Sequence, residues 1–287
     1  MHLKPPFLAG TFVLSTAIVG ASANPVDRLE VSIPVEAGVA VPAEVFSISK
    51  SEAKVRILTS TDVKENNQSS HGVSIREAER SRRVGRAITL NALLVNGGFS
   101  ETPTERPAGL LISEGALVSL ADFSIRKGDP KNSCKMRQRD APRLAGVLCI
   151  AKDGRASIGD VLQAKPDACH GAIQAGPLLV EKAGEVAICD SEGAEQAFRT
   201  AVCLQQGTLS FVVTKERIAT YDLARWLATP LSAGGLGCER ALNLSGDASS
   251  GAVYFPGGFP SFTRRRRVGP GTFPLASLIL VESRRLP

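Results

Sequence analysis

Short apolar runs, each bounded by polar or glycine-containing residues, recur along nearly the whole chain. Residues 29–63 alternate apolar and polar side chains, as expected of strands with one buried face. Further strand-like runs lie at residues 92–95, 109–112, 117–120, 146–151, 178–180, 186–189, 198–204, 209–214, 242–244 and 278–281. This pattern favours an α+β fold, with a single large domain built around a central, mainly antiparallel or mixed sheet and flanked by a few helices.

Two segments show helical spacing instead. Residues 75–87 show helical spacing through Ile75, Ala78, Val84 and Ala87, with an arginine-rich outer face,. Residues 220–228 form the second predicted helix, in which Leu223 and Leu227 share a face and Thr220 is expected to cap the N-terminus,. Between these helices, residues 198–204 and 209–214 are expected to pair as a hairpin around residues 205–207.

The first 23 residues have the features of a signal peptide rather than of a folded segment. Lys4 gives a basic start, residues 7–20 are mostly apolar, and Ala21-Ser22-Ala23 fits the small-residue cleavage rule,. The apolar stretch is too short to favour a stable membrane span, although an uncleaved anchor is the alternative. We therefore expect residues 1–23 to be removed and residues 24–287 to form one exported domain, periplasmic or secreted.

Cysteine content and charge add to this expectation. Six cysteines, at positions 134, 149, 169, 189, 203 and 238, indicate disulfides formed in an oxidising compartment,. Cys134 with Cys149, and Cys169 with Cys189, are the expected pairs because each brackets a plausible hairpin; the alternative is that some cysteines are small buried residues. A net charge of +6 favours anionic partners such as phosphorylated sugars or envelope polymers,. Nucleic acid is not expected as a partner.

Four polar turns combine small residues with groups able to bind a ligand. Glycine amides can turn toward an anion, while amide, guanidinium, hydroxyl and carboxylate side chains supply complementary contacts. The candidate binding residues are Asn96, Gly97, Gly98, Gln174, Gly176, Thr200, Asn243, Ser245 and Gly246, and the candidate catalytic residues are Glu101, Arg199 and Asp247.

Each turn also has a simpler structural interpretation. Residues 96–98 form an ordinary tight turn in that interpretation, and Gln174 makes an accessory hydrogen bond at the start of a strand. Arg199 enters an apolar run, so its guanidinium needs a partner, which is either a bound phosphate or carboxylate or an internal acid. Asp247 either serves as an acid, base or ligand, or bonds the backbone of its own turn.

Taken in order, these turns resemble the phosphodiester glycosidase family. The family shows Asn-Gly-Gly-Phe/Tyr before an acidic residue, a Gly-Leu strand, an acidic-Gly dipeptide, Gln-Ala-Gly-Pro, Arg-Thr-Ala, a short helix and Ala-Leu-Asn-Leu-Asp-Gly-Gly-x-Ser-Ser. The matching positions are 96–99 with Glu101, 109–111, 114–115, 174–177, 199–202, 223–227 and 241–250, and the resemblance spans about residues 29–281. The last motif departs from the family, because Ser245-Gly246-Asp247 stands where Asp-Gly-Gly is usual.

The resemblance implies an exported hydrolase that cleaves the glycosidic C–O bond next to phosphate in sugar-1-phosphodiesters of envelope or exopolysaccharide glycans. Arg199 and the amides of Gly97 and Gly98 would hold the phosphate. Asn96, Gln174 and Asn243 would orient the sugar, and Glu101 or Asp247 would activate water or stabilise the cation. The altered turn supports the alternative of a non-catalytic glycan-binding protein. No cofactor or metal is required, and a divalent cation beside Asp247 is compatible with the sequence.

Overall fold

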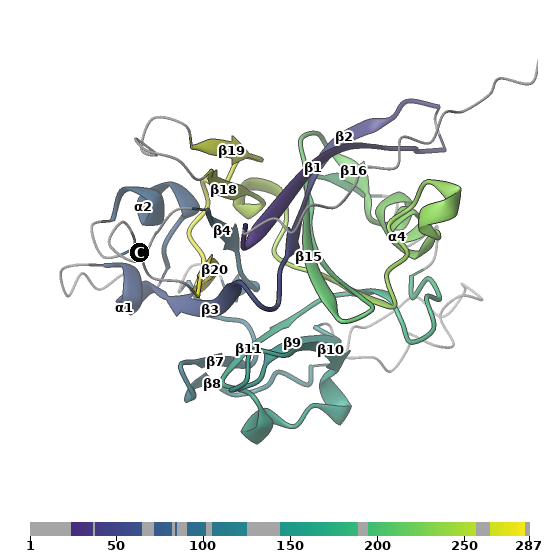
Figure 1. The fold of residues 1–287 in the computed structure, drawn as a ribbon. Coiled ribbons are helices and arrows are strands. Elements are labelled where there is room, and N and C mark those ends of the chain that lie inside the picture. The colour runs from purple at the N-terminus through teal and green to yellow at the C-terminus, as the bar shows by residue number, and fades with distance from the viewer. Residues whose placement is uncertain are drawn as a thin grey trace, which may run out of the picture.

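The computed structural model describes residues 24–36, 38–64, 72–81, 84, 91–101, 105–124, 144–188, 195–256 and 265–284. Every strand pairing recorded among these residues is antiparallel. The strands form three larger sheets that surround a common core, with a few helices outside them (Figure 1). The predicted α+β class with mainly antiparallel strands is confirmed, and the strands are shared among three sheets.

The strands of each sheet come from distant parts of the sequence. The six-stranded sheet has the order β1 (Val26–Ile33), β2 (Val41–Ile48), β15 (Thr208–Thr214), β14 (Thr200–Gln205), β17 (Arg240–Asn243) and β12 (Leu178–Val180). The β11 sheet has the order β10 (Ala156–Asp160), β9 (Gly146–Ile150), β11 (Gly171–Ala175), β7 (Leu111–Ser113) and β8 (Ala116–Ser119). The β4 sheet has the order β19 (Arg266–Val268), β18 (Ala252–Phe255), β4 (Ala92–Asn96), β20 (Ser277–Ser283) and β3 (Ala53–Thr59). Two short pairs complete the set: β5 (Ser100–Glu101) with β6 (Arg106–Pro107), and β13 (Gln196–Ala197) with β16 (Ile218–Ala219).

The helices cover the outer faces of two sheets. They are α1 (Ser60–Val63), α2 (Ile75–Arg80) and α4 (Thr220–Ala228), with 3₁₀ turns at Val161–Gln163, Pro166–Ala168, Leu231–Ala233 and Asp247–Ser249. The helix predicted at residues 220–228 is present as α4, but its capping prediction is wrong, because Ala219 is the N-cap and Thr220 is already helical. The helix predicted at residues 75–87 is shorter than expected, because α2 ends at Arg80 with Ser81 as its C-cap; residues 82, 83 and 85–87 lie outside the described residues. None of the helices in the described ranges is long and apolar enough to cross a bilayer.

The main core lies where the inner faces of the three sheets meet. Phe46 and Phe211 from the six-stranded sheet, Ile173 from the β11 sheet, and Leu93 and Ile279 from the β4 sheet all belong to it. A second cluster packs α4 against the outer face of the six-stranded sheet, and a third packs α1 and α2 against the β4 sheet. The turns that end β4, β11 and β17 are therefore carried on rigid, mutually packed strands.

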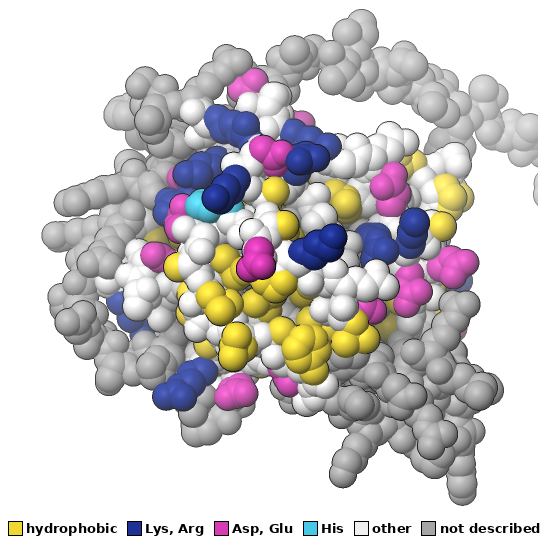
Figure 2. Space-filling model, turned by 90° about the horizontal axis from the view of Figure 1, so that it is seen from below, with side chains coloured by type: hydrophobic (Ala, Val, Ile, Leu, Met, Phe, Trp, Pro, Cys, Tyr) yellow, Lys and Arg dark blue, Asp and Glu magenta, His cyan; other side chains and the backbone are white. Residues whose placement is uncertain are grey.

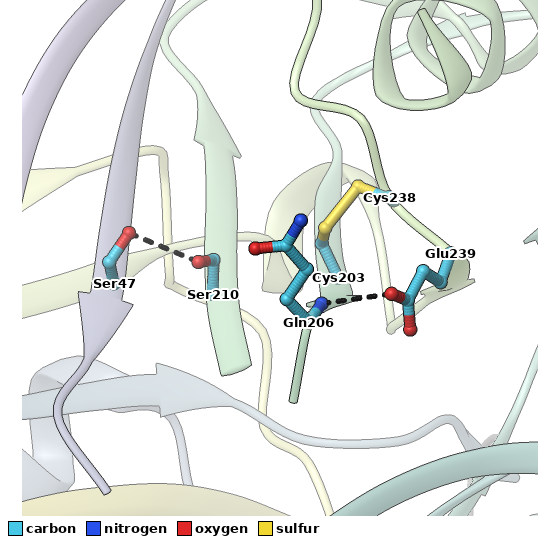
Figure 3. The surroundings of a disulfide bond; sticks show 6 residues. All are labelled: Ser47, Cys203, Gln206, Ser210, Cys238 and Glu239. Carbon is cyan, nitrogen blue, oxygen red and sulfur yellow. Dashed lines mark hydrogen bonds between the residues drawn. A yellow bond between two sulfur atoms is a disulfide. The ribbon is translucent and has the colours of Figure 1, made fainter. Parts of the chain in front are cut away.

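Two disulfides are present among the described residues. Cys149 pairs with Cys169, and Cys203 pairs with Cys238 (Figure 3). The predicted pairs are wrong, because β9 and β11 are neighbours whose register sets Cys149 opposite Ala172, close to Cys169. Cys134 and Cys189, the other members of the predicted pairs, lie outside the described residues. The second disulfide joins β14 to the segment entering β17, where the backbone amide of Gln206 also donates to the Glu239 carboxylate at 3.1 Å (Figure 3).

The outer face of the β11 sheet carries much of the exposed apolar surface. Seen from below, hydrophobic side chains gather over this sheet and charged side chains lie around them (Figure 2). Large exposed side chains in this region include Leu117, Val118 and Leu120 in and after β8, together with Phe123 and Leu162.

A buried ion-pair network supports the edge of the six-stranded sheet. Glu44 in β2 is only 3% exposed and accepts hydrogen bonds from Arg28 at 2.5 Å and 2.7 Å, while the Lys215 ammonium lies 3.1 Å away. Burial by itself raises the pKa of the Glu44 carboxyl, but the hydrogen bonds and charges of Arg28 and Lys215 outweigh it, so the net pKa is lowered,.

Protonation of Glu44 is therefore expected to destabilise the protein in acid. Because the folded-state pKa lies below the ordinary value of 4.5, the contribution of Glu44 is complete above that pH and is lost as the pH falls through the folded-state pKa,. Urea unfolding at a series of acidic pH values should show a shallower decline in stability for Glu44→Gln than for the wild type. Glu36→Gln, at an exposed pair with Arg225, is the control and should follow the wild type. An unchanged slope in Glu44→Gln would contradict the assignment.

Candidate functional site

The turn after β17 is held by the end of β4. Asn96 is fully buried, donates from Nδ2 to the Ser245 carbonyl at 2.6 Å, and accepts from the Gly251 amide at Oδ1 at 3.0 Å. The Ser245 amide donates in return to the Gly97 carbonyl at 3.1 Å. Two of the predicted segments thus lie together, but the side-chain amide of Asn96 is used within the protein and supports the turn.

Gly97 and Gly98 serve close packing between strands. The Gly97 amide donates to the Ser277 carbonyl at 3.1 Å, and the Gly98 amide donates to the Ser277 hydroxyl at 3.2 Å. A Cβ atom on Gly97 would collide with Ser277, and one on Gly98 would collide with Ile173. Both amides expected to hold a phosphate therefore already donate to β20 in this structure.

Gln174 joins three segments through its side chain. It is 2% exposed, and its Oε1 accepts from the amides of Leu110 at 2.9 Å and Asp122 at 2.8 Å. Its Nε2 donates to the carbonyls of Asp122 at 2.6 Å and Leu144 at 2.8 Å. All four bonds are made within the protein, so the side-chain amide of Gln174 joins these segments in this structure.

Arg199 is partly buried and lies just before β14. Its backbone pairs with Thr214, and its Nη2 donates to the Glu195 carbonyl at 2.9 Å. Its Nε is buried and has no hydrogen-bond partner within the described structure. Burial lowers the pKa of the guanidinium, and the carboxylates of Glu195 and Asp247 act to raise it. None of the ion pairs recorded among the described residues neutralises this cation directly.

Asn243 provides a matching buried acceptor on the neighbouring strand. The residue is 1% exposed and donates from Nδ2 to the Gly176 carbonyl at 3.0 Å, whereas its Oδ1 is buried without a partner in the described structure. In the pairing of β14 with β17, Asn243 lies opposite Ala201, and Ala201 is two residues after Arg199 in the sequence. Arg199 directly precedes β14, the strand that pairs with β17, so Arg199 and Asn243 lie near the same end of these two strands.

A hydroxyl network fills the interior of the turn. The hydroxyls of Thr200 and Ser250 lie 2.8 Å apart, and those of Ser245 and Ser249 lie 2.7 Å apart. Thr200 and Ser250 are fully buried, and Ser245 is 5% exposed. Ser245, which stands where the family usually has an aspartate, is thus part of the internal bonding of the turn.

At Gly246 and Asp247 the backbone of the turn lies next to Arg199. A Cβ atom on Gly246 would lie 3.6 Å from Nη1 of Arg199, so the backbone passes close to the guanidinium. The Asp247 amide donates to the Phe198 carbonyl at 2.8 Å, and its carboxylate forms an ion pair with Arg217 at 2.9 Å. Sequence reasoning missed Arg217, because nothing in its local sequence distinguishes it from other exposed arginines.

The contacts do not bring Glu101 into this group. It lies exposed in β5, opposite Arg106 in β6. The described side chains also include no group of three or more His, Cys, Asp and Glu residues that could hold a metal ion.

Comparison with known proteins agrees with this architecture. Zebrafish N-acetylglucosamine-1-phosphodiester alpha-N-acetylglucosaminidase, in a catalytic-domain structure auto-inhibited by its pro-peptide, has a similar fold (TM-score 0.59, 16% identity, 92% of this chain and 86% of that chain covered). A hypothetical protein from Synechocystis is similar over 92% of this chain and 65% of that chain (TM-score 0.59, 13% identity). A protein from Burkholderia pseudomallei described as exported is similar over 85% and 74% (TM-score 0.51, 13% identity).

At these identities the structural likeness shows a shared fold. A search of curated protein sequences gave no match. The family model described as phosphodiester glycosidase matches residues 91–281, which include all four polar turns and most of the chain. The chain therefore belongs to the phosphodiester glycosidase family.

Proposed function

We propose that this protein is an exported hydrolase that cleaves the bond between a sugar and phosphate in a sugar-1-phosphodiester. The observation that carries the proposal is that Nε of Arg199, just before β14, and Oδ1 of Asn243, at the end of β17, are both buried without a hydrogen-bond partner in the described structure. Buried polar groups in folded proteins are nearly always hydrogen-bonded, so these atoms have the character of ligand contacts. One is a cationic donor and the other an acceptor, which suits a phosphate beside a sugar hydroxyl.

Arg199 is assigned to the phosphate. A planar guanidinium can donate two parallel bonds to phosphate oxygens, and its charge acts more strongly where the surroundings are partly buried. In the reaction, the anomeric carbon becomes cationic while negative charge builds up on the departing phosphate. Arg199 would stabilise that developing charge, and this lowers the barrier without a strong general acid.

Asn243 and Asp247 are assigned to the sugar side. The free Oδ1 of Asn243 can accept from a sugar hydroxyl, because its Nδ2 is already fixed by the Gly176 carbonyl,. Asp247 is the predicted carboxylate that lies beside Arg199, and we assign it to water activation or stabilisation of the oxocarbenium ion,. Glu101 is the alternative carboxylate. Asn96, Gln174, Gly97, Gly98, Thr200 and Ser245 are assigned to building the site.

Export is proposed from the disulfides and the predicted signal peptide. Disulfides persist mainly in oxidising compartments, and two are formed among the described residues,. The predicted signal peptide at residues 1–23 lies outside the described residues. An anionic envelope or exopolysaccharide glycan is the proposed substrate, consistent with the positive net charge,.

A second candidate is a glycan-binding protein that does not hydrolyse its ligand. The observation that favours it is Ser245, whose hydroxyl is bonded to Ser249 where the family usually places a carboxylate. This candidate uses the same Arg199 and Asn243 contacts but lacks an effective catalytic acid or base.

Incubation with a panel of sugar-1-phosphodiesters distinguishes the two candidates. The purified mature protein is expected to release free sugar from at least one member of the panel, at a rate that saturates with substrate. Calorimetric binding without sugar release would support the binding protein instead. Neither binding nor release across a panel that varies sugar and aglycone would overturn the proposed function.

A further inference from the structure

Arg217 is an exposed arginine whose guanidinium is nevertheless fixed by three contacts. It lies between β15 and β16, and its side chain is 55% exposed. Its Nη2 lies 2.9 Å from the Asp247 carboxylate, its Nη1 donates to the Gln196 carbonyl at 3.1 Å, and its Cζ lies 5.6 Å from the centre of the Phe198 ring. A solvent-exposed arginine held in one place in this way is preorganised for binding an anion.

The same contacts place Arg217 beside the proposed phosphate site. Phe198, on which Arg217 stacks, directly precedes Arg199 and accepts from the Asp247 amide. Gly246, directly before Asp247, packs against the Arg199 guanidinium. The Asp247 carboxylate therefore interacts with two cations: it pairs with Arg217 and attracts Arg199 at longer range.

The ion pair of Asp247 with Arg217 is easily exchanged. Both side chains are 55% exposed, and pairs between solvent-exposed charges contribute little net free energy,. Asp247 also adopts a positive φ of 51°, a left-handed conformation that residues other than glycine populate sparsely,. Backbone hydrogen bonds from the Asp247 amide to the Phe198 carbonyl and from the Ser250 amide to the Asp247 carbonyl hold this conformation, so the turn does not depend on the carboxylate contact with Arg217.

We propose that Arg217 is a second anion-binding residue of this site and that Asp247 is an internal counterion, which the phosphodiester group displaces from Arg217. The proposal rests on the proposed function for its choice of anion. Two guanidiniums can each bind a different non-bridging oxygen of one phosphodiester. Displacement also frees the Asp247 carboxylate for the sugar side, so phosphate binding and presentation of the carboxylate occur together.

A calorimetric titration of the mature protein with diethyl phosphate tests the proposal, because it measures binding of the anion without any hydrolysis. Arg217→Ala is expected to weaken binding about tenfold or more, because a charge-assisted contact is lost. Asp247→Asn is expected to strengthen binding about threefold, because the competing charge is removed while the side-chain shape is kept. In the Arg217→Ala background, Asp247→Asn should give no such gain, since the counterion then has no paired cation to release.

A matched control is available on α4. Arg225 also stacks on an aromatic ring, with its Cζ 5.7 Å from the centre of Tyr221, and it also pairs with a carboxylate, that of Glu36. Arg225→Ala should bind diethyl phosphate like the wild type. Weaker or unchanged binding in Asp247→Asn, unchanged binding in Arg217→Ala, or no binding by the wild type would each overturn the inference. Sugar release by a wild type that fails these titrations would leave the proposed function standing and reject the inference alone.

Discussion

Replacing Arg199 with alanine is expected to lower turnover of a sugar-1-phosphodiester by about 100- to 1,000-fold, the usual effect of removing one group that stabilises developing negative charge. The substitution removes the hydrogen bond from the guanidinium to the Glu195 carbonyl and its electrostatic attraction to Glu195 and Asp247. Because the cation is partly buried and has no ion-pair partner among the described residues, its loss should leave the fold intact. Turnover and thermal unfolding, measured on the same preparation, check both parts.

Two further substitutions make the test of Arg199 specific. Arg199→Lys keeps the positive charge but removes the planar guanidinium with its two parallel donors. It should therefore recover only part of the activity that Arg199→Ala loses. Arg155→Ala removes an arginine that is 82% exposed and paired with Asp153, and it should behave as the wild type. Full activity in Arg199→Ala would exclude the guanidinium from the mechanism. A large loss of stability together with activity would show that Arg199 acts as an internal support.

Local elements of the fold were predictable because neighbouring residues determine them. The hairpin formed by β14 and β15 follows from the alternation of apolar and polar residues around a glycine-containing turn,. The bounds of α4 follow from the helical spacing of its apolar residues,. The cap of α4 was not predictable in the same way, because both Ala219 and Thr220 are compatible with the spacing. The disulfides were also mispredicted, since the pairing of Cys149 with Cys169 depends on which strands become neighbours.

The candidate site was predictable only in part for a related reason. Glycine turns and buried amides look alike in sequence whether they contact a ligand or a distant strand. The partner of Gly98 is Ser277, 179 residues away, and Gln174 meets segments from three other places in the chain. Arg199 and Asn243 keep their proposed roles because the described part of the structure leaves a polar atom of each without a partner.

Gln174→Met is expected to destabilise the protein by about 3 to 5 kcal/mol, because two buried and two part-buried backbone groups lose their hydrogen bonds to this side chain, and each fully buried unsatisfied group costs about 1 to 3 kcal/mol,. Methionine keeps the length and unbranched shape of the side chain, so the cost reflects the lost hydrogen bonds and not a cavity. Those groups are the amides of Leu110 and Asp122 and the carbonyls of Asp122 and Leu144. Urea unfolding of both proteins at neutral pH measures the difference.

The Gln174 substitution also decides between support and ligand contact at this turn. Gln163→Met, at an exposed position on the 3₁₀ turn after β10, is the control and should change stability by less than about 0.5 kcal/mol,. If Gln174 oriented a sugar, Gln174→Met would instead retain wild-type stability and lose activity. If Gln174→Met is less stable than the wild type but its folded fraction keeps the wild-type KM, Gln174 supports the fold and does not contact the substrate. Recognition of the ligand then depends on the β14 and β17 side of the site, where Arg199 and Asn243 each have a polar atom without a partner among the described residues.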